Sequence, residues 1–386
     1  MRNARRLFVW LFIAALPMLA ACSVPRYGDD RALPEVTPAV SATPVAPTSL
    51  GPNASLADLL AFASAHNPGI QSAKLRATAD AEKMSQARYL PDPMFDFEQA
   101  FTESTRKYTV SQMFPNIAKI AAAVEAARWN AELSAQSAEI TRNRIRYDVK
   151  RTYFDLYLVG KRVALMEEDR KLMTSVKQIA EAKYKAGIED VTTILKIEVE
   201  LAKLDNDIRS MKDMAHPMAA MLRATLDAPA DLEISLPPRI PEVKLTHEEI
   251  ALRAMINSGN PQVKASDLMV KTEKAMLLQA RAEKKVDITV ALMVQDNAMG
   301  NGMSSFMVGV NLPLYRGRYE AMERQAMASV AAAERELVDM RNMLGSELSS
   351  ALFEVRDAER RIALYTGSLV PLAAESLKVS EKSFAA

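Results

Sequence analysis

The residue types that most often carry catalysis or bind metal lack suitable partners in this sequence. His247-Glu248 is followed by Ala251, where the HExxH motif of zinc peptidases has its second histidine. His66 and His216 have no partner at metal-ligand spacing, and no nucleophile elbow is present. We therefore expect no enzyme activity, no resident metal ion and no cofactor.

Methionine is the other residue type that could do chemistry, and the sequence has 22 of them. Met293, Met299, Met303 and Met307 occur in one short stretch. Thioether sulfur suits soft cations such as Cu(I) and Ag(I). However, methionine is also an adaptable packing residue, and these four residues do not share one spacing. The sequence alone favours packing over a metal site.

Cys22 is the single cysteine, so it cannot form an internal disulfide bond. Basic residues, an apolar run from Leu7 to Leu16 and small residues before Cys22 predict a secretory signal at residues 1–21. The end of this signal resembles a lipobox, which implies that Cys22 carries lipid such as palmitate. The alternative is an ordinary signal peptide. The serine after the cysteine favours the outer membrane, and the proline-rich residues 22–54 predict an extended tether.

The overall composition favours long helices and argues against nucleic-acid binding. Lysine plus arginine (49) nearly balances aspartate plus glutamate (48), and no basic stripe interleaved with aromatic residues appears. Glycine is scarce at 12 residues, whereas good helix formers such as alanine, leucine and glutamate are abundant.

The chain contains an internal repeat. Thr141–Tyr157 aligns without gaps with Met340–Arg356, and an Asn-Pro pair at residues 67–68 has a counterpart at residues 260–261. We therefore predict a first repeat at residues 55–230, a linker at 231–244 and a second repeat at 245–386. Each repeat is predicted to run helix, helix, two strands and a very long helix.

Four segments alternate strictly between apolar and polar residues, which predicts strands with one apolar and one polar face. The predicted strands are at about 93–101, 105–113, 285–296 and 304–313. Their length suits the crossing of a bilayer at a tilt, although a soluble β-sandwich shows the same alternation. Four strands cannot close a barrel, and open strand edges are not tolerated in lipid. Several copies of the chain must therefore combine.

Long helices are predicted at about 118–184, 191–226 and 316–384, where apolar residues recur with the three–four spacing of a coiled-coil seam. Gly187 lies between the first two, because glycine tolerates the left-handed conformation of a helix end. Ser55 with Asp58 predicts the start of the first helix. Thr246 to Glu249 reads as a capping box for its counterpart in the second repeat.

Taken together, the chain resembles the TolC-type outer-membrane efflux family, close to its CzcC/CusC heavy-metal branch. The resemblance rests on the lipobox, the duplicated Asn-Pro helix, Leu90-Pro91-Asp92-Pro93 before the first strand, Ser111 to Pro115 at the end of the second, and Tyr184-x-x-Gly187. It implies a mainly α fold in which a homotrimer closes one twelve-stranded barrel, continued by an α-barrel into the periplasm. It also implies that Gly187, Ile188 and Asp190 form a tip that meets a periplasmic adaptor.

The function expected from this resemblance is a passive exit duct of a tripartite efflux pump, which exports metal cations and is energised by an RND-type inner-membrane pump. Drugs, dyes or secreted peptides are the alternative solutes. Asp96, Glu98, Asp287 and Thr289 are expected to line its lumen. The second repeat ends before a counterpart of residues 191–226, so the family's constricting acidic residues cannot be assigned, and we favour a truncated sequence. The alternatives are a periplasmic adaptor lipoprotein and a non-transporting coiled-coil envelope lipoprotein.

Overall fold

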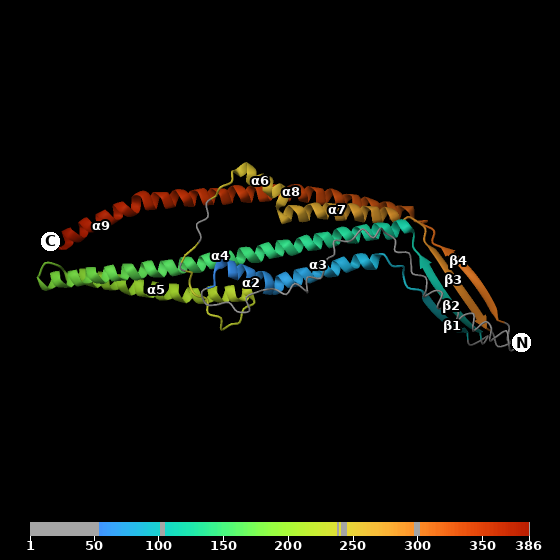
Figure 1. The fold of residues 1–386 in the computed structure, drawn as a ribbon, viewed down its shortest axis with the longest axis horizontal. Coiled ribbons are helices and arrows are strands. Elements are labelled where there is room, and N and C mark those ends of the chain that lie inside the picture. Colours follow the sequence, from blue (N-terminus) through green and yellow to red (C-terminus); the bar gives the residue numbers. More distant parts are fainter. Residues whose placement is uncertain (1–53, 101–104, 238, 241–244, 297–301, 386) are drawn as a thin grey trace. The chain divides into compact units, whose positions relative to one another are not determined.

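The computed structural model describes residues 54–100, 105–237, 239–240, 245–296 and 302–385. Within these ranges the protein is mainly helical, with one four-stranded antiparallel sheet (Figure 1). The predicted fold class is therefore confirmed. Cys22 and Met299 lie outside the described residues.

The helices and strands occur twice in the same order, which confirms the duplicated plan. In the first half they are α2 (Leu56–His66), α3 (Pro68–Ala87), β1 (Met94–Ala100), β2 (Thr105–Phe114), α4 (Ile117–Lys185) and α5 (Val191–Leu226). In the second half they are α6 (Glu249–Gly259), α7 (Pro261–Ala282), β3 (Ile288–Asp296), β4 (Met303–Val310), α8 (Arg316–Leu364), the π-helical turn η1 (Tyr365–Leu369) and α9 (Val370–Ala385).

The two repeats begin their first helices differently. Ser55 caps α2 as expected. With Asp58 it forms a capping box, in which each side chain accepts a hydrogen bond from the backbone N–H of the other. The capping box predicted at Thr246 is wrong. The N-cap of α6 is Glu248, which makes no side-chain capping bond, and Thr246 lies two residues too early to reach the first turn.

The Asn-Pro pair shapes the junction between α2 and α3. Pro68 is the first residue of α3, where its missing N–H costs nothing. Asn67 is buried; its side-chain oxygen accepts a hydrogen bond from the N–H of Ile70 (3.1 Å), and its side-chain nitrogen donates to the carbonyl of Thr225 (2.7 Å). One side chain therefore both starts a helix and fastens it to α5.

The described chain forms two compact units, each built from both repeats. The first contains Ala77–Ser134 and Ser266–Glu336, which include the whole sheet and the helix segments that adjoin it. The second contains the remaining described residues, which include α2, α5 and α6. Among the described helices, none is both long enough and apolar enough to span a membrane.

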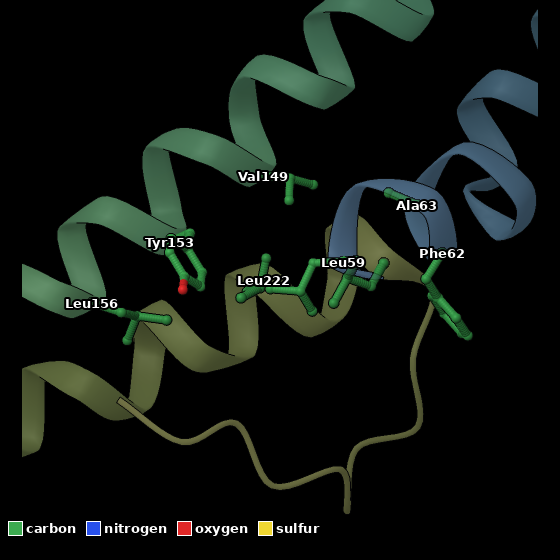
Figure 2. Packing of buried hydrophobic residues seen from close by; sticks show 8 residues of the cluster. Leu59, Phe62, Ala63, Val149, Tyr153, Leu156 and Leu222 are labelled. Atoms are coloured by element: carbon green, nitrogen blue, oxygen red, sulfur yellow. The ribbon is translucent and has the colours of Figure 1, made fainter. Parts of the chain in front are cut away.

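The core of the second unit is formed where α2, α4 and α5 meet. Figure 2 shows its buried side chains pointing toward one another from the three helices. Val149 and Leu156 come from the predicted seam of α4, and Leu222 from that of α5. The cluster consists of Leu59, Phe62, Ala63, Val149, Tyr153, Leu156, Leu222 and Leu226.

Beyond this core, ion pairs connect α4 and α5 along their length. Lys212 lies 2.7 Å from Glu167, and Lys177 lies 2.8 Å from Glu198. Each of these pairs is largely exposed and stabilises little by itself. Their spacing along both helices fixes the antiparallel register more than it adds stability.

The helix predicted at about 316–384 is interrupted by a π-helical turn, η1. Pro371 follows this turn in α9. Proline lacks an N–H, and in a regular helix its ring collides with the carbonyl four residues earlier. The turn relieves this collision, because the N–H of Val370 bonds to the carbonyl of Tyr365, five residues back. The apolar spacing of residues 316–384 predicted no such interruption.

Leu222→Ala tests the importance of the three-helix core. Leu222 is fully buried, so we expect the free energy of unfolding to fall by about 2–5 kcal/mol. Met221→Ala, at the exposed neighbouring position, is expected to change it by less than about 0.5 kcal/mol. Helical circular dichroism during denaturant unfolding of the detergent-purified protein measures both. Equal effects of the two substitutions would contradict this assignment of the core.

Candidate functional site

The candidate site is the four-stranded sheet, because its two faces differ in chemistry. Residues that face each other across antiparallel strands point to the same side. The register therefore defines an apolar face, whose apolar members are Phe95, Phe97, Tyr108, Val110, Phe114, Ile288, Val290, Leu292, Val294, Phe306, Val308 and Val310. The opposite, polar face includes Asp96, Glu98, Lys107, Thr109, Ser111, Thr289, Gln295 and Ser305.

The apolar face is not covered by the described part of the chain. Phe95 and Phe306 are each 65% exposed, and Phe97, Val308 and Val310 are also exposed. A soluble sandwich would bury such residues against a second sheet, but the described residues form only one sheet. Contiguous exposed apolar surface marks contact with lipid or with another protein.

The polar face brings together three of the predicted lumen residues. Asp96 and Glu98 lie on β1, and Thr289 lies on β3. Glu98 accepts a hydrogen bond from Lys107 Nζ at 3.1 Å across the β1–β2 hairpin. Both partners of this pair keep substantial exposure, so the face presents charge to water.

The outer strands of the sheet have no partner within the described chain. The order is β1-β2-β3-β4, so β1 and β4 each present one row of backbone groups without a strand beside it. Exposed strand edges readily pair with another chain, and in lipid they must do so. The strand length suits a bilayer: the ten residues of β2 extend about 34 Å, and a tilt of about 40° reduces this to about 25 Å, the height of the apolar band in membrane barrels.

Asp287 differs from the other predicted lumen residues. It precedes β3, and its side chain is only 12% exposed. Its carboxylate accepts hydrogen bonds from Lys119 Nζ (2.7 Å), the backbone N–H of Asn116 (2.9 Å) and the side chain of Asn311 (3.2 Å). This geometry does not fit a water-facing carboxylate. Asp287 instead connects the ends of β2 and β4 with the start of β3.

The surroundings of Asp287 favour its charged form. Partial burial raises the pKa of its carboxyl, but the hydrogen bonds from Lys119 and Asn116 outweigh that effect and hold the pKa below its ordinary value of 3.8. Sequence reasoning missed Lys119 and Asn311, because no spacing connects residues so far apart in the chain. The available signal was that polar residues closely follow β2 and β4 and directly precede β3.

The turn between α4 and α5 has a fully specified geometry. Gly187 adopts φ +74°, and the N–H groups of Gly187 and Ile188 bond to the carbonyls of Tyr184 and Lys183, which is the Schellman pattern. Asp190 caps α5 by accepting a hydrogen bond from the N–H of Thr192 at 3.1 Å. Ile188 is 72% exposed. Gly187 and Asp190 therefore shape the turn, and Ile188 presents an apolar side chain to the surroundings.

No group of three or more histidine, cysteine, aspartate or glutamate residues suited to a metal ion occurs in the described part of the chain. The candidate site is a surface with two contrasting faces and two open edges.

The sequence is similar to that of a known resistance protein. No family model matches the chain. The cobalt-zinc-cadmium resistance protein CzcC of Cupriavidus metallidurans is 24% identical over 342 residues, which cover 81% of this chain and 78% of CzcC.

Solved structures show the same fold over most of the chain. The outer membrane protein VceC of Vibrio cholerae superposes with a TM-score of 0.70 at 16% identity and covers 85% of both chains. CusC gives a TM-score of 0.65 at 14% identity and covers 86% of this chain and 83% of CusC. The MtrE outer membrane channel of Neisseria gonorrhoeae gives 0.60 at 17% identity, with 85% and 80% covered. The chain has the fold of the TolC-type outer-membrane channels.

This fold agrees with one of the interpretations that the sequence left open. A periplasmic adaptor would carry split β segments around a single helical hairpin, and a coiled-coil lipoprotein would not need strands with one apolar face. Instead, the described chain repeats a helix–hairpin–helix unit and forms one sheet from both hairpins. The predicted resemblance in fold to outer-membrane channels is therefore confirmed.

Asp287→Asn tests the ionic connection at the strand ends. It removes the negative charge that faces the poorly exposed Lys119, so we expect a loss of about 1–3 kcal/mol of stability, measured as thermal unfolding of the purified protein. Glu98→Gln, which breaks an exposed pair, should have little effect. Because the pKa of Asp287 is lowered on folding, its contribution is complete above pH 3.8 and is lost as the pH falls through the lowered value. A difference between wild type and Asp287→Asn that persisted undiminished in stronger acid would contradict this account.

Proposed function

We propose that this protein is the outer-membrane channel of a tripartite efflux system, a passive duct without a reaction of its own. The observation that carries the proposal is the pair of contrasting sheet faces, the apolar one being exposed and the sheet being open at both edges. Lipid covers an exposed apolar face without further protein, and copies of the same chain satisfy the open edges.

The proposed number of chains in the ring follows from the number of strands that a barrel needs to enclose a water-filled passage. Each chain supplies four strands. Two chains give an eight-stranded barrel, in which side chains fill the interior. Three chains give twelve strands and are the smallest ring of this kind that leaves a water-filled passage. A homotrimer also agrees with the resemblance to the TolC-type family.

In this ring the apolar face meets the hydrocarbon and the polar face lines the passage. Asp96, Glu98 and Thr289 are then lumen-lining residues. Asp287 is not among them, because its carboxylate accepts hydrogen bonds from Lys119 and Asn116. A polar interior around an apolar exterior is the arrangement found in membrane barrels.

The turn between α4 and α5 is the proposed contact with a periplasmic adaptor, which in turn connects the channel to an inner-membrane pump of the RND type. Ile188 is the apolar group that the turn presents, and the Schellman pattern and the Asp190 cap hold it in place. A rigid apolar tip binds with little loss of conformational freedom.

The proposed cellular position is the outer membrane, with the long helices in the periplasm and a lipid anchor on Cys22. In this proposal residues 1–21 are removed and residues 22–54 form the tether to the first repeat. The relative CzcC is a cobalt-zinc-cadmium resistance protein, and metal cations are the solutes that we propose for this channel.

Phe306→Arg and Ser305→Arg form a matched test of the two faces. Adjacent residues on one strand point to opposite faces. An arginine on the lipid side costs about 2–4 kcal/mol at mid-membrane, so Phe306→Arg should fail to assemble in the outer membrane, whereas Ser305→Arg should assemble. Outer-membrane fractionation, native-gel oligomer size and the cobalt, zinc and cadmium tolerance of a complemented deletion strain measure the outcome. Equal assembly of both variants would rule out the lipid-facing assignment.

Ile188→Asp tests the adaptor contact separately from assembly. The side chain is 72% exposed, so the variant should fold and form the oligomer normally while tolerance of metal salts falls to the level of the deletion strain. Ile188→Val keeps an apolar group and should retain most of the tolerance. Crosslinking of the adaptor through a photoreactive group at the neighbouring exposed position Lys185 reports the contact, and undiminished crosslinking in the Ile188→Asp background would refute this role.

A further inference from the structure

All four connections between strands and helices lie at one end of the sheet. β1 and β3 begin at this end and β2 and β4 finish there, because Phe114 pairs with Ile288 and Ile288 pairs with Val310 (Figure 1). The adjoining parts of α3, α4, α7 and α8 belong to the same compact unit as the sheet. We call these connections, with the first turn of α8, the junction belt; it consists of residues 88–93, 115–116, 283–287 and 311–318.

The junction belt extends the exposed apolar face of the sheet. Phe114, Ile288 and Val310 form the last row of that face, and all three are exposed. Directly beyond β4, Leu314 is 75% exposed and Tyr315 is 80% exposed. Tyrosine is enriched where a bilayer meets water, because its ring is apolar and its hydroxyl group can still form hydrogen bonds.

The belt also carries an excess of positive charge, and its acidic residues are partly neutralised within the chain. Glu283 and Asp287 both face Lys119, at 3.7 Å and 2.7 Å. Lys284 lies 3.8 Å from Glu323 of α8. The basic residues of the belt are Arg88, Lys284, Lys285, Arg316 and Arg318, and its acidic residues are Asp92, Glu283 and Asp287.

Three of the basic side chains have no anionic partner in the part of the chain that the structure describes. Lys285, Arg316 and Arg318 are exposed, and none of them forms an ion pair with a described residue. Both arginines lie in the first turn of α8, where the helix dipole favours acidic residues, and this turn contains none. Neither an internal ion pair nor the stability of α8 therefore accounts for these cations.

Cations next to exposed apolar side chains at the end of a membrane-facing surface match the chemistry of phospholipid headgroups. Lysine and arginine place their apolar stems against hydrocarbon and their charges at the level of the headgroups. Arginine also binds phosphate oxygens in a bidentate manner. The formal net charge of the whole chain is only +1, so any attraction to an anionic lipid must come from a local group of cations.

We propose that the junction belt binds anionic phospholipid through Lys285, Arg316 and Arg318, with Leu314 and Tyr315 beside the acyl chains. The lipid belongs to the leaflet that faces the periplasm, because the long helices begin at this end of the sheet. The proposal rests on the proposed function for the statement that the sheet lies in a membrane.

Native mass spectrometry of the purified full-length protein in neutral detergent tests this proposal. Titration with phosphatidylglycerol, and separately with phosphatidylcholine of the same acyl chains, gives an apparent Kd for each lipid. The belt variant combines Lys285→Gln, Arg316→Gln and Arg318→Gln. The control variant combines Lys196→Gln, Arg162→Gln and Arg209→Gln, which remove one lysine and two arginines that are exposed on α4 and α5.

The wild type should bind phosphatidylglycerol at least tenfold more tightly than phosphatidylcholine, because each cation near an anionic lipid surface contributes about fivefold in affinity. The control variant should keep this preference. The belt variant should lose at least tenfold in affinity for phosphatidylglycerol and bind phosphatidylcholine as before, with its oligomer size on a native gel unchanged.

Equal affinity of the wild type for the two lipids would overturn the proposal, and this comparison needs no variant. Undiminished phosphatidylglycerol binding by the belt variant, or an equal loss in the control variant, would also overturn it. Glycerol phosphate at the concentration of the lipid should not displace the lipid, and displacement would assign the cations to a free phosphate instead. Failure of the channel function itself would appear separately, as equal assembly of Phe306→Arg and Ser305→Arg.

Discussion

Backbone hydrogen bonding at the edges of a four-stranded sheet constrains the whole molecule. The strands β1 and β4 each leave one row of N–H and C=O groups without a partner in the described chain. In water such groups can bond to solvent, but in hydrocarbon each one left unpaired costs several kcal/mol. A sheet with such edges can therefore stay in a membrane only as part of a closed ring.

Side-chain contacts connect the strand ends with the helices that adjoin them. At Asp287 a carboxylate, an ammonium group and two asparagines connect the ends of β2, β3 and β4. Arg281 on α7 and Glu323 on α8 form a further pair at 2.7 Å in the same unit. The strands and the helix segments beside them are thus connected by charge-assisted hydrogen bonds, which are stronger than neutral ones.

Much of the fold could be predicted from the sequence, because it depends on periodicity. Alternation at Phe95 and Phe97 marked a strand, and the three–four spacing that includes Val149 and Leu222 marked helices that pack together. Features that depend on two distant segments could not be predicted in this way. The partners of Asp287 and the common face of Met293 with Met307 both require the register between strands, which no spacing within one segment reveals.

Two features of the helices differ from the sequence-based prediction, and each has a cause within a few residues. Thr246 has the residue type of a cap, but the N-cap of α6 is Glu248, two residues beyond it, so the position of the helix start and not the residue type decided its role. Pro371 lies in a sequence otherwise suited to a continuous helix, and the π-helical turn before it accommodates the proline. The lipid anchor and the contact at Ile188 depend on molecules other than this chain, and so they stay predictions.

The duplicated hairpins have one more consequence. The first hairpin carries the charged residues Asp96, Glu98 and Lys107 on its polar face, whereas on the second the corresponding face is formed by thioethers and small or neutral polar groups. A ring of three chains therefore contains six hairpins of two alternating kinds, so its inner wall has threefold and not sixfold chemistry. A solute moving along it would meet three hairpins with charged side chains, separated by three hairpins with methionine side chains.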